Sequence, residues 1–323
     1  RRLTFAGYRT AMASPIFFSH PASAEHDTGS HPERRERIFA IERHLEQTGW
    51  FGFERRDSPR VARELLESCH DSGYVAALER LCAVGGGQID DDTLVSQGSW
   101  EAAMRAVGGA VAVVDVLLSG EAPAAFSAGR PPGHHALRAR AGGFCLFNNI
   151  AVAAIHALGA HALARVLIFD WDVHHGNGTN DLFHSTPEVL YVSIHESPLY
   201  PGSGPASDRG SGAGEGFTLN LPVPAFSGDD VFCELVHSRV IPLARDFRPQ
   251  LILVSAGYDA HAEDPLADCL VSDAGFATMT TAIRRLGEEL EAPVGFVLEG
   301  GYELDALARS VAATLEALSG GEP

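Results

Sequence analysis

Six short apolar runs alternate with helix-length segments over the last two thirds of this 323-residue chain. The runs are rich in Val, Ile and Leu and largely continuous, which is typical of strands buried on both faces. The expected strands are residues 124–127, 166–170, 189–195, 217–223, 251–256 and 294–299. Amphipathic segments between them predict helices at residues 100–118, 147–158, 229–247, 273–290 and 304–318. Because no Pro-rich linker divides the chain, we predict a single α/β domain with a central parallel sheet flanked by helices on both faces.

The net charge limits which partners the protein can bind, and the cysteine content indicates the cellular compartment. The sequence has 42 Asp and Glu against 24 Arg and no Lys, which gives a formal net charge of −18. An acidic surface repels phosphate backbones, so we expect no nucleic-acid partner. Five cysteines form no Cys-x-x-Cys pair, which favours free thiols in a reducing cytoplasm. The most apolar stretch, residues 150–169, is interrupted by His156, His161 and Arg165, so it predicts a helix followed by a strand and no membrane span.

The extent of the domain and one Gly-rich segment complete the outline. Met12 is a candidate start, so we expect the domain to occupy residues 12–323, with residues 1–11 upstream of it. Residues 202–216 are Gly-rich like a phosphate loop, but they precede an expected strand instead of joining a strand to a helix. We therefore predict a mobile surface loop at this segment.

Polar residues cluster just after several expected strands, where parallel sheets gather their sites. Asp170, Asp172 and His174 are spaced by two, so an extended backbone directs all three to one side. A carboxylate and an imidazole on one face form half of a zinc site, although such residues also cap helices, and a helix is expected soon afterwards. Asp259 follows a later apolar run. Alone it would be a turn or N-cap residue, but with Asp172 and His174 it completes a metal site of two carboxylates and one histidine.

Two further strand ends carry groups suited to acid–base chemistry. His134 and His135 lie in a Pro- and Gly-rich loop after residues 124–127, which would aim both rings into one pocket, and His exchanges protons near neutral pH. Tyr302 follows two glycines after the last strand, where its hydroxyl would donate to a developing oxyanion. Taken singly, each of these is also compatible with an ordinary loop. His261 is a weaker candidate ligand, for which we expect a role in its loop.

Together these motifs resemble the zinc-dependent histone deacetylase family, in particular its class II and bacterial amidohydrolase branch within the acetylpolyamine amidohydrolase superfamily. The matching motifs occur in the family's order at residues 29–34, 130–135, 142–145, 170–179, 191–195, 255–266 and 300–302. The resemblance implies the arginase/deacetylase fold and one catalytic zinc ion per chain.

The resemblance also implies the metal ligands. Zn²⁺ would be held by Asp172, His174 and Asp259. One or two structural K⁺ ions are expected as well. The first potassium site matches Asp170, Asp172, Ser193 and the carbonyls of His174 and Ile194. The second matches backbone donors of Phe183, Thr186 and Val189.

The catalytic roles carry over in the same way. His135 resembles the general base that later protonates the leaving amine, His134 its electrostatic partner, and Tyr302 the oxyanion donor. Asp170 is expected to accept a hydrogen bond from His134, and Asn177 to orient His135. Because a neutral Asn stabilises an imidazolium less than a carboxylate does, we expect His135 to stay neutral more easily than His134.

The residues expected to contact the substrate form a tunnel and the rim around its entrance. The tunnel that resembles the family's acyl channel would be walled by Gly143, Phe144, Tyr200 and Leu266. Polyamine-selective eukaryotic relatives have Glu where this chain has Leu266, whereas bacterial polyamine deacetylases use other devices. Asp92 is the candidate rim carboxylate that grips substrate amides, although its run of three Asp is equally compatible with a solvated acidic surface.

The sequence thus predicts a zinc amidohydrolase that removes acetyl or another small acyl group from N-acyl-lysine-type amides. An alternative keeps the site and changes the substrate to acetylpolyamines or other small acetylated amines. More remote alternatives are a binuclear manganese ureohydrolase and a non-catalytic acyl-lysine binder. Relatives in this branch are often dimers or tetramers, so a homo-oligomer is a further expectation.

Overall fold

Eight parallel strands form one central sheet in the computed structural model, which describes residues 13–321. The expected domain start at residue 12 and the assignment of residues 1–11 lie outside the described residues. The strands are β1 (Ile16–Ser19), β2 (Glu54–Asp57), β5 (Ala124–Ser127), β6 (Val166–Asp170), β7 (Val189–Glu196), β8 (Thr218–Val223), β9 (Leu251–Ala256) and β10 (Val294–Leu298). Their order across the sheet is β2-β1-β5-β10-β9-β6-β7-β8, and every pairing is parallel. The predicted parallel α/β fold is confirmed.

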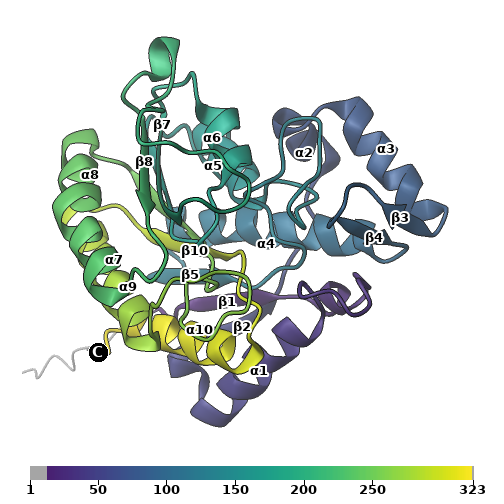
Figure 1. The fold of residues 1–323 in the computed structure, drawn as a ribbon, viewed down its shortest axis with the longest axis horizontal. Helices are drawn as coiled ribbons and strands as arrows, with labels where there is room; N and C mark the ends of the chain where they lie inside the picture. The colour runs from purple at the N-terminus through teal and green to yellow at the C-terminus, as the bar shows by residue number, and fades with distance from the viewer. Residues whose placement is uncertain (1–12, 322–323) are drawn as a thin grey trace, which may run out of the picture.

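Helices cover both faces of this sheet (Figure 1). One layer contains α1 (Glu36–Thr48), α7 (Asp229–Leu235), α8 (Ile241–Phe247), α9 (Asp273–Leu290) and α10 (Leu304–Leu318). The other contains α2 (Arg63–Cys69), α3 (Ser72–Ala83), α4 (Ser99–Leu118), α5 (Asn149–Gly159) and α6 (Asn177–Phe183). A small antiparallel hairpin of β3 (Gly86–Gln88) and β4 (Leu94–Ser96) lies beside α3. The sheet is therefore the middle of three layers.

Each face of the sheet has its own hydrophobic core because successive side chains of a strand point to opposite sides. In β6, Leu167 and Phe169 pack into the core below α9 and α10, whereas Ile168 packs into the core below α4 and α5. All three side chains have no solvent exposure. Burial on both faces explains why the runs in the sequence are continuously apolar.

Most of the expected elements coincide with the observed ones within two residues. The predicted helix at residues 229–247 is divided into α7, a π-helical segment (Val236–Val240) and α8. The Gly-rich segment at residues 202–216 contains only the short 3-10 turn Gly212–Gly214, as expected of a loop. Elements before residue 99 were not predicted. One of them, β2, is built of charged residues and carries no apolar signal.

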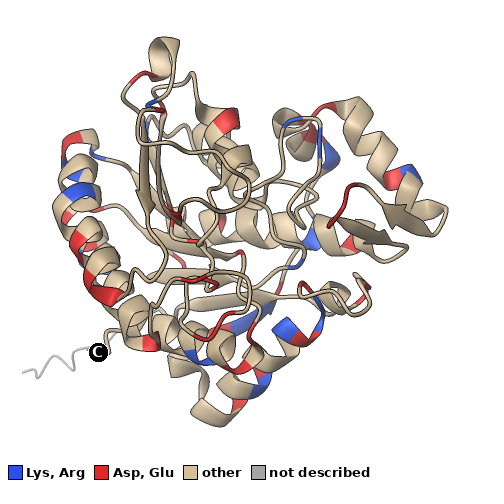
Figure 2. Ribbon diagram, viewed as in Figure 1, with Lys and Arg blue, Asp and Glu red and all other residues tan. Residues whose placement is uncertain are grey.

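Charged residues lie mainly on the outer helices and loops, and a few acidic positions are found at the centre, where strands end (Figure 2). All five cysteines are free thiols, as their spacing predicts. Among residues 13–321, no helix combines the length and apolar character needed to cross a membrane.

Close packing of α4 on a neighbouring loop gives a test of the fold. A Cβ atom on Gly108, in the middle of α4, would lie 1.9 Å from the carbonyl oxygen of Pro59. We expect Gly108→Ala to lower the free energy of unfolding by about 1–3 kcal/mol, because backbone must move to accept the methyl group. Urea denaturation measures this change. Gly159→Ala is the matched control, because a Cβ atom on Gly159 has no neighbour within 4 Å. It should change stability by less than about 1 kcal/mol, and equal losses in both variants would contradict the packing argument.

Candidate active site

The candidate site lies at the carboxyl edge of the sheet, where four neighbouring strands end. The sheet order places β5, β10, β9 and β6 side by side, although β5 and β10 are more than 160 residues apart in sequence. The loop after β5 carries His134 and His135, the loop after β6 carries Asp172 and His174, and the other two loops carry Asp259 and Tyr302. The topology therefore brings the predicted chemical groups to one place.

Asp172, His174 and Asp259 form a buried cradle of metal donors. One ligand atom from each residue lies within 4.8 Å of the other two. The Nδ1 atom of His174 is 3.1 Å from Asp172 Oδ1 and 3.1 Å from Asp259 Oδ2. Backbone N–H groups orient the carboxylates, because Gly300 donates to Asp172 Oδ2 at 2.8 Å and Val173 donates to Asp259 Oδ1 at 2.9 Å.

The electrostatics of this cradle favour a cation. Burial would raise the pKa of Asp172, but His134 and His174 outweigh burial and hold that pKa well below its ordinary value. Burial would lower the pKa of His174, but hydrogen bonds to Asp172 and Asp259 raise the pKa of His174 to about 10. The point where the three donors meet thus attracts positive charge, and two carboxylates with one imidazole are donors that suit a divalent transition metal.

Helix capping does not account for these residues. The residue before α6 is Gly176, and no side chain caps that helix. His261 does not point into the cradle either, because its Nε2 faces Asp273 of α9 at 3.3 Å and its Nδ1 accepts the N–H of Glu263. His261 therefore serves its loop, as expected.

The two adjacent histidines have different partners. His134 Nδ1 is 3.1 Å from Asp170 Oδ2, and His135 Nδ1 is 2.8 Å from Asn177 Oδ1. The ring centroids of the two histidines lie 4.0 Å apart. Because an amide oxygen only accepts hydrogen bonds, Nδ1 of His135 carries its proton and Nε2 keeps a free lone pair. This arrangement is suited to a general base.

Their surroundings shift the two pKa values in opposite directions. Burial lowers the pKa of His134, but Asp172 and Asp170 outweigh burial and hold that pKa well above its ordinary value. Burial, together with the neighbouring His134 and His174, lowers the pKa of His135 well below its ordinary value. A charged His134 beside a neutral His135 is the order expected from Asn177 in the sequence, and a titration of both residues would test it.

Tyr302 lies beside the cradle as a protonated hydroxyl. Burial and the nearby Asp259 raise the pKa of Tyr302 well above its ordinary value, so the phenol keeps its proton to donate. Its ring makes an edge contact with Phe144, with centroids 5.6 Å apart. Its backbone N–H donates to Asp264 Oδ2 at 2.6 Å, and the guanidinium of Arg37 lies 5.0 Å from its ring centroid.

Three residues that position the site had no assigned role in the sequence. Glu299 Oε2 accepts the backbone N–H groups of Gly133 and His134, and thereby ties β10 to the histidine loop. Asp264 holds Tyr302, and Arg37 donates to the Gly301 carbonyl at 2.6 Å. Asp264 lies within the matching motif at residues 255–266, and Glu299 directly precedes the motif at residues 300–302, which is the signal that would have found them. Arg37 lies inside α1, where an Arg gives no such signal.

The predicted tunnel residues are brought partly together. Gly143 lies so close to His135 and Tyr200 that a Cβ atom would be 2.5 Å and 2.9 Å from their rings. Tyr200 is 44% exposed, so it stands at the mouth of the site. Burial and the charge of Asp92 raise the pKa of Tyr200 to about 12. A carboxylate oxygen of Asp90 and the Tyr200 hydroxyl both lie within 4 Å of the Cβ position of Gly142, so this acidic run faces the same rim. Leu266 donates its backbone N–H to Asp264, the residue that holds Tyr302.

The predicted potassium ligands lie in two places along β7. The register of β6 and β7 pairs Asp170 with Ser193, and Ile194 follows directly in the buried strand. Phe183 and Thr186 lie in one turn after α6, where the N–H of Thr186 donates to the Phe183 carbonyl. Val189 begins β7 just beyond this turn. The register thus brings Asp170 beside Ser193, and a hydrogen bond brings Thr186 beside Phe183.

A central parallel sheet of this order, with an Asp–His–Asp cradle and a histidine pair at its carboxyl edge, defines the arginase/deacetylase class of proteins. Residues 31–318 match the family model for the histone deacetylase domain. The chain therefore belongs to the histone deacetylase family, whose members are deacetylases and amidohydrolases and are generally dependent on a metal.

Individual similar proteins also carry the name of this family. Histone deacetylase 14, chloroplastic, of Arabidopsis thaliana is 39% identical over 94% of this chain and 77% of the relative. The histone deacetylase-like amidohydrolase of Pseudomonas aeruginosa is 38% identical over 96% of this chain and 82% of the relative. A crystal structure of the HDA15 HD domain superposes with a TM-score of 0.92 at 34% identity, over 96% of this chain and 89% of that one.

Two glycines leave the space that the cradle needs. A Cβ atom on Gly257 would lie 2.0 Å from Asp172 Oδ2, and one on Gly300 would lie 2.1 Å from Asp259 Oδ2. We expect Gly257→Ala and Gly300→Ala to displace these carboxylates and to weaken the binding of a divalent metal ion at the cradle by about 10–100-fold. Metal analysis after dialysis against a chelator measures the loss. Gly142→Ala is the matched control, because its nearest neighbour would be 3.5 Å away. Full metal retention by Gly257→Ala would show that the cradle does not bind the metal.

Proposed function

We propose that this protein is a zinc-dependent deacetylase that hydrolyses N-acyl-lysine-type amides. The observation that carries the proposal is the buried cradle of Asp172, His174 and Asp259 beside a neutral His135 and a protonated Tyr302. His135 and His174 have ring centroids 6.0 Å apart, so a base faces the metal donors. This combination supplies an electrophile, a base and an oxyanion donor in one pocket.

The zinc ion, held by the three cradle residues, would polarise the amide carbonyl and acidify a bound water. His135 then accepts the proton of the attacking water at Nε2, because its Nδ1 is committed to Asn177. The same Nε2 later returns a proton to the departing amine, which leaves as the neutral amine. His134 stays protonated beside Asp170 and stabilises the negative charge that develops in the pocket.

Tyr302 donates a hydrogen bond to the carbonyl oxygen as it becomes an oxyanion. The phenol is fixed by Asp264 at its backbone and by Phe144 and Arg37 at its ring, so little reorganisation accompanies the reaction. A donor that is already oriented towards the developing charge contributes more than one that must turn.

The rim supports an extended aliphatic substrate. Phe144 and Tyr200 present aromatic surfaces near the cradle, which suit the methylene chain of an acylated lysine. In this proposal the carboxylate of Asp92, whose charge raises the pKa of Tyr200, binds a substrate N–H group. In this proposal the two donor clusters along β7 hold K⁺ and stabilise the loops that carry the zinc ligands.

The binuclear manganese alternative meets a steric obstacle at Gly176. That reaction needs a further carboxylate at this position to bridge a second metal. A Cβ atom on Gly176 would lie 2.3 Å from Asp170 Oδ2 and 2.6 Å from the hydroxyl of Tyr191. The space that an acidic side chain would need is therefore filled, which supports the mononuclear reaction.

Tyr302→Phe tests the proposed chemistry. It removes the oxyanion donor, so we expect kcat on an acetyl-lysine peptide to fall by about 10²–10³-fold with Zn²⁺ still bound. Steady-state kinetics of zinc-loaded protein measure this fall. Tyr258→Phe is the matched control, because the Tyr258 hydroxyl donates to Thr314. It should leave kcat nearly unchanged. Zinc-loaded wild-type protein that binds the peptide without any turnover would instead favour the non-catalytic binder.

Leu266→Glu tests the substrate class. With Leu266 in place, we expect kcat/KM to be higher for an acetyl-lysine peptide than for acetylputrescine, because no carboxylate is present at this position to bind the ammonium group of acetylputrescine. Leu266→Glu should shift the ratio towards acetylputrescine by about tenfold, which corresponds to one added charge pair. Leu270→Glu adds the same charge at a 46% exposed position and should leave the ratio unchanged. A wild-type preference for acetylputrescine would favour the polyamine alternative.

A further inference from the structure

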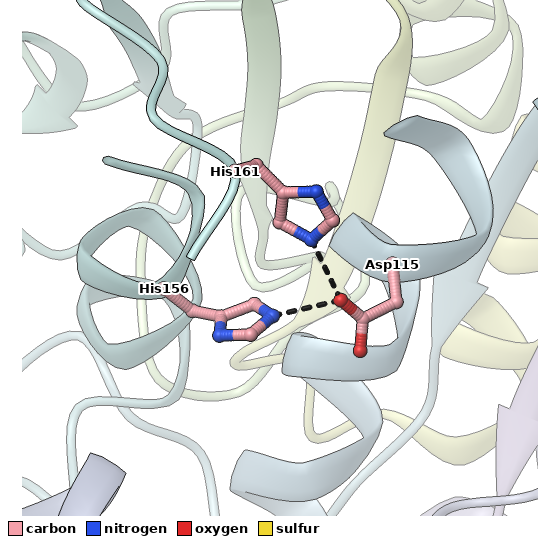
Figure 3. A group of neighbouring side chains, drawn as sticks. All are labelled: Asp115, His156 and His161. Carbon is pink, nitrogen blue, oxygen red and sulfur yellow. Dashed lines mark hydrogen bonds and ion pairs between the residues drawn. The ribbon is translucent and has the colours of Figure 1, made fainter. Parts of the chain in front are cut away.

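A second cluster of metal-type donors lies outside the candidate active site. Asp115 of α4 and His156 of α5 meet His161, which follows α5 on the way to β6. Asp115 Oδ1 is 2.7 Å from His156 Nε2 and 2.8 Å from His161 Nε2. Figure 3 shows both rings turned towards this one oxygen. The three donor atoms all lie within 4.8 Å of one another.

The cluster lies at the opposite edge of the sheet from the candidate active site. In a parallel α/β fold the helices run back against the strands, so they end near the amino ends of the strands. Asp115 is in the last turn of α4, and His156 is in the last turn of α5. The last turn of a helix carries partial negative charge, which favours a cation. The ends of α4 and α5 and the carboxylate of Asp115 therefore all favour a positive charge at this place.

The geometry permits metal binding with small movements. The rings have centroids 5.2 Å apart at an interplanar angle of 84°, so their Nε2 atoms approach a common point from different directions. Tetrahedral Zn²⁺ with bonds of about 2.0 Å separates its ligand atoms by about 3.3 Å, so each contact of 2.7–2.8 Å must open by about half an ångström. Each ring would give up its Nε2 proton and keep a proton at Nδ1.

We infer that Asp115, His156 and His161 form a second, surface site for a divalent transition metal ion such as Zn²⁺, Ni²⁺ or Cu²⁺. Two imidazoles and one carboxylate are donors that these ions prefer over Mg²⁺ or Ca²⁺. The Asp115 side chain is 50% exposed, which leaves room for water ligands and for entry of the ion. A bound ion would join α4, α5 and the segment that leads into β6, and it would thereby stabilise the layer that covers one face of the sheet.

The test uses the zinc-loaded enzyme, in which one equivalent of Zn²⁺ already occupies the cradle of the candidate active site. Calorimetric titration with Zn²⁺ should show one further equivalent per chain and a rise in melting temperature. His161→Gln and Asp115→Asn should each weaken this second equivalent by at least about tenfold, because each removes a ligand. Both should retain the first equivalent and the deacetylase activity, so failure of this site is distinguishable from failure of the proposed function.

A two-donor pair provides the matched control. His184 Nε2 lies 2.8 Å from Asp208 Oδ1. Among residues 13–321, no third His, Cys, Asp or Glu donor joins this pair to make a set of three that could hold a metal ion. His184→Gln should keep the second equivalent. Anomalous diffraction from a Zn²⁺-soaked crystal should place an ion between the three donors. Absence of a second equivalent, or its persistence at full affinity in His161→Gln, would overturn the inference and leave the cluster as a hydrogen-bonded link between helices.

Discussion

Burial of negative charge at one end of the sheet is the constraint on which the rest of the structure depends. The carboxylates buried there include Glu33, Asp170, Asp172, Asp259, Asp264 and Glu299. A buried charge without a partner costs several kcal/mol. The strand ends can therefore lie together only if other residues bind and neutralise the buried carboxylates. Arg130 binds Glu33 through two nitrogens, and Arg37 reaches the same carboxylate and the carbonyl of Glu299. A divalent cation in the cradle would complete this neutralisation, which links metal binding to the stability of the fold.

The central strands and the chemical groups were predictable because local patterns determine both. The bounds of β6 and β9 agree with the sequence prediction residue for residue, since each is an uninterrupted apolar run that ends at a polar motif. The spacing predicted Asp172 and His174 on one side of an extended chain. The structure brings both into the cradle with Asp259, but from bends that follow the end of β6 at Asp170 and not from extended backbone. In such cases the local sequence pattern and the final packing favour the same structure.

Other parts depend on contacts that no local pattern contains. β2 is an edge strand with the sequence Glu-Arg-Arg-Asp, so its place in the sheet follows from pairing with β1 and not from hydrophobicity. Arg37 contacts Gly301, 264 residues away, and nothing near Arg37 in the sequence indicates that its charge is buried. The π-helical segment that divides residues 229–247 contacts α9, and the amphipathic pattern of the sequence did not predict it. The adjacency of β5 and β10, on which the site depends, is also a long-range property.

The crowding around Gly176 has a consequence for how members of this fold class evolve. A carboxylate at this position would collide with Asp170 and with the Tyr191 hydroxyl, so the first step from a mononuclear to a binuclear centre is blocked by two neighbours. Removing Tyr191 first would leave Asp170 without one of its hydrogen-bond donors. An acidic residue at position 176 of this chain therefore requires both neighbouring side chains to move. The packing of one glycine thus separates two chemistries that the same sheet can support.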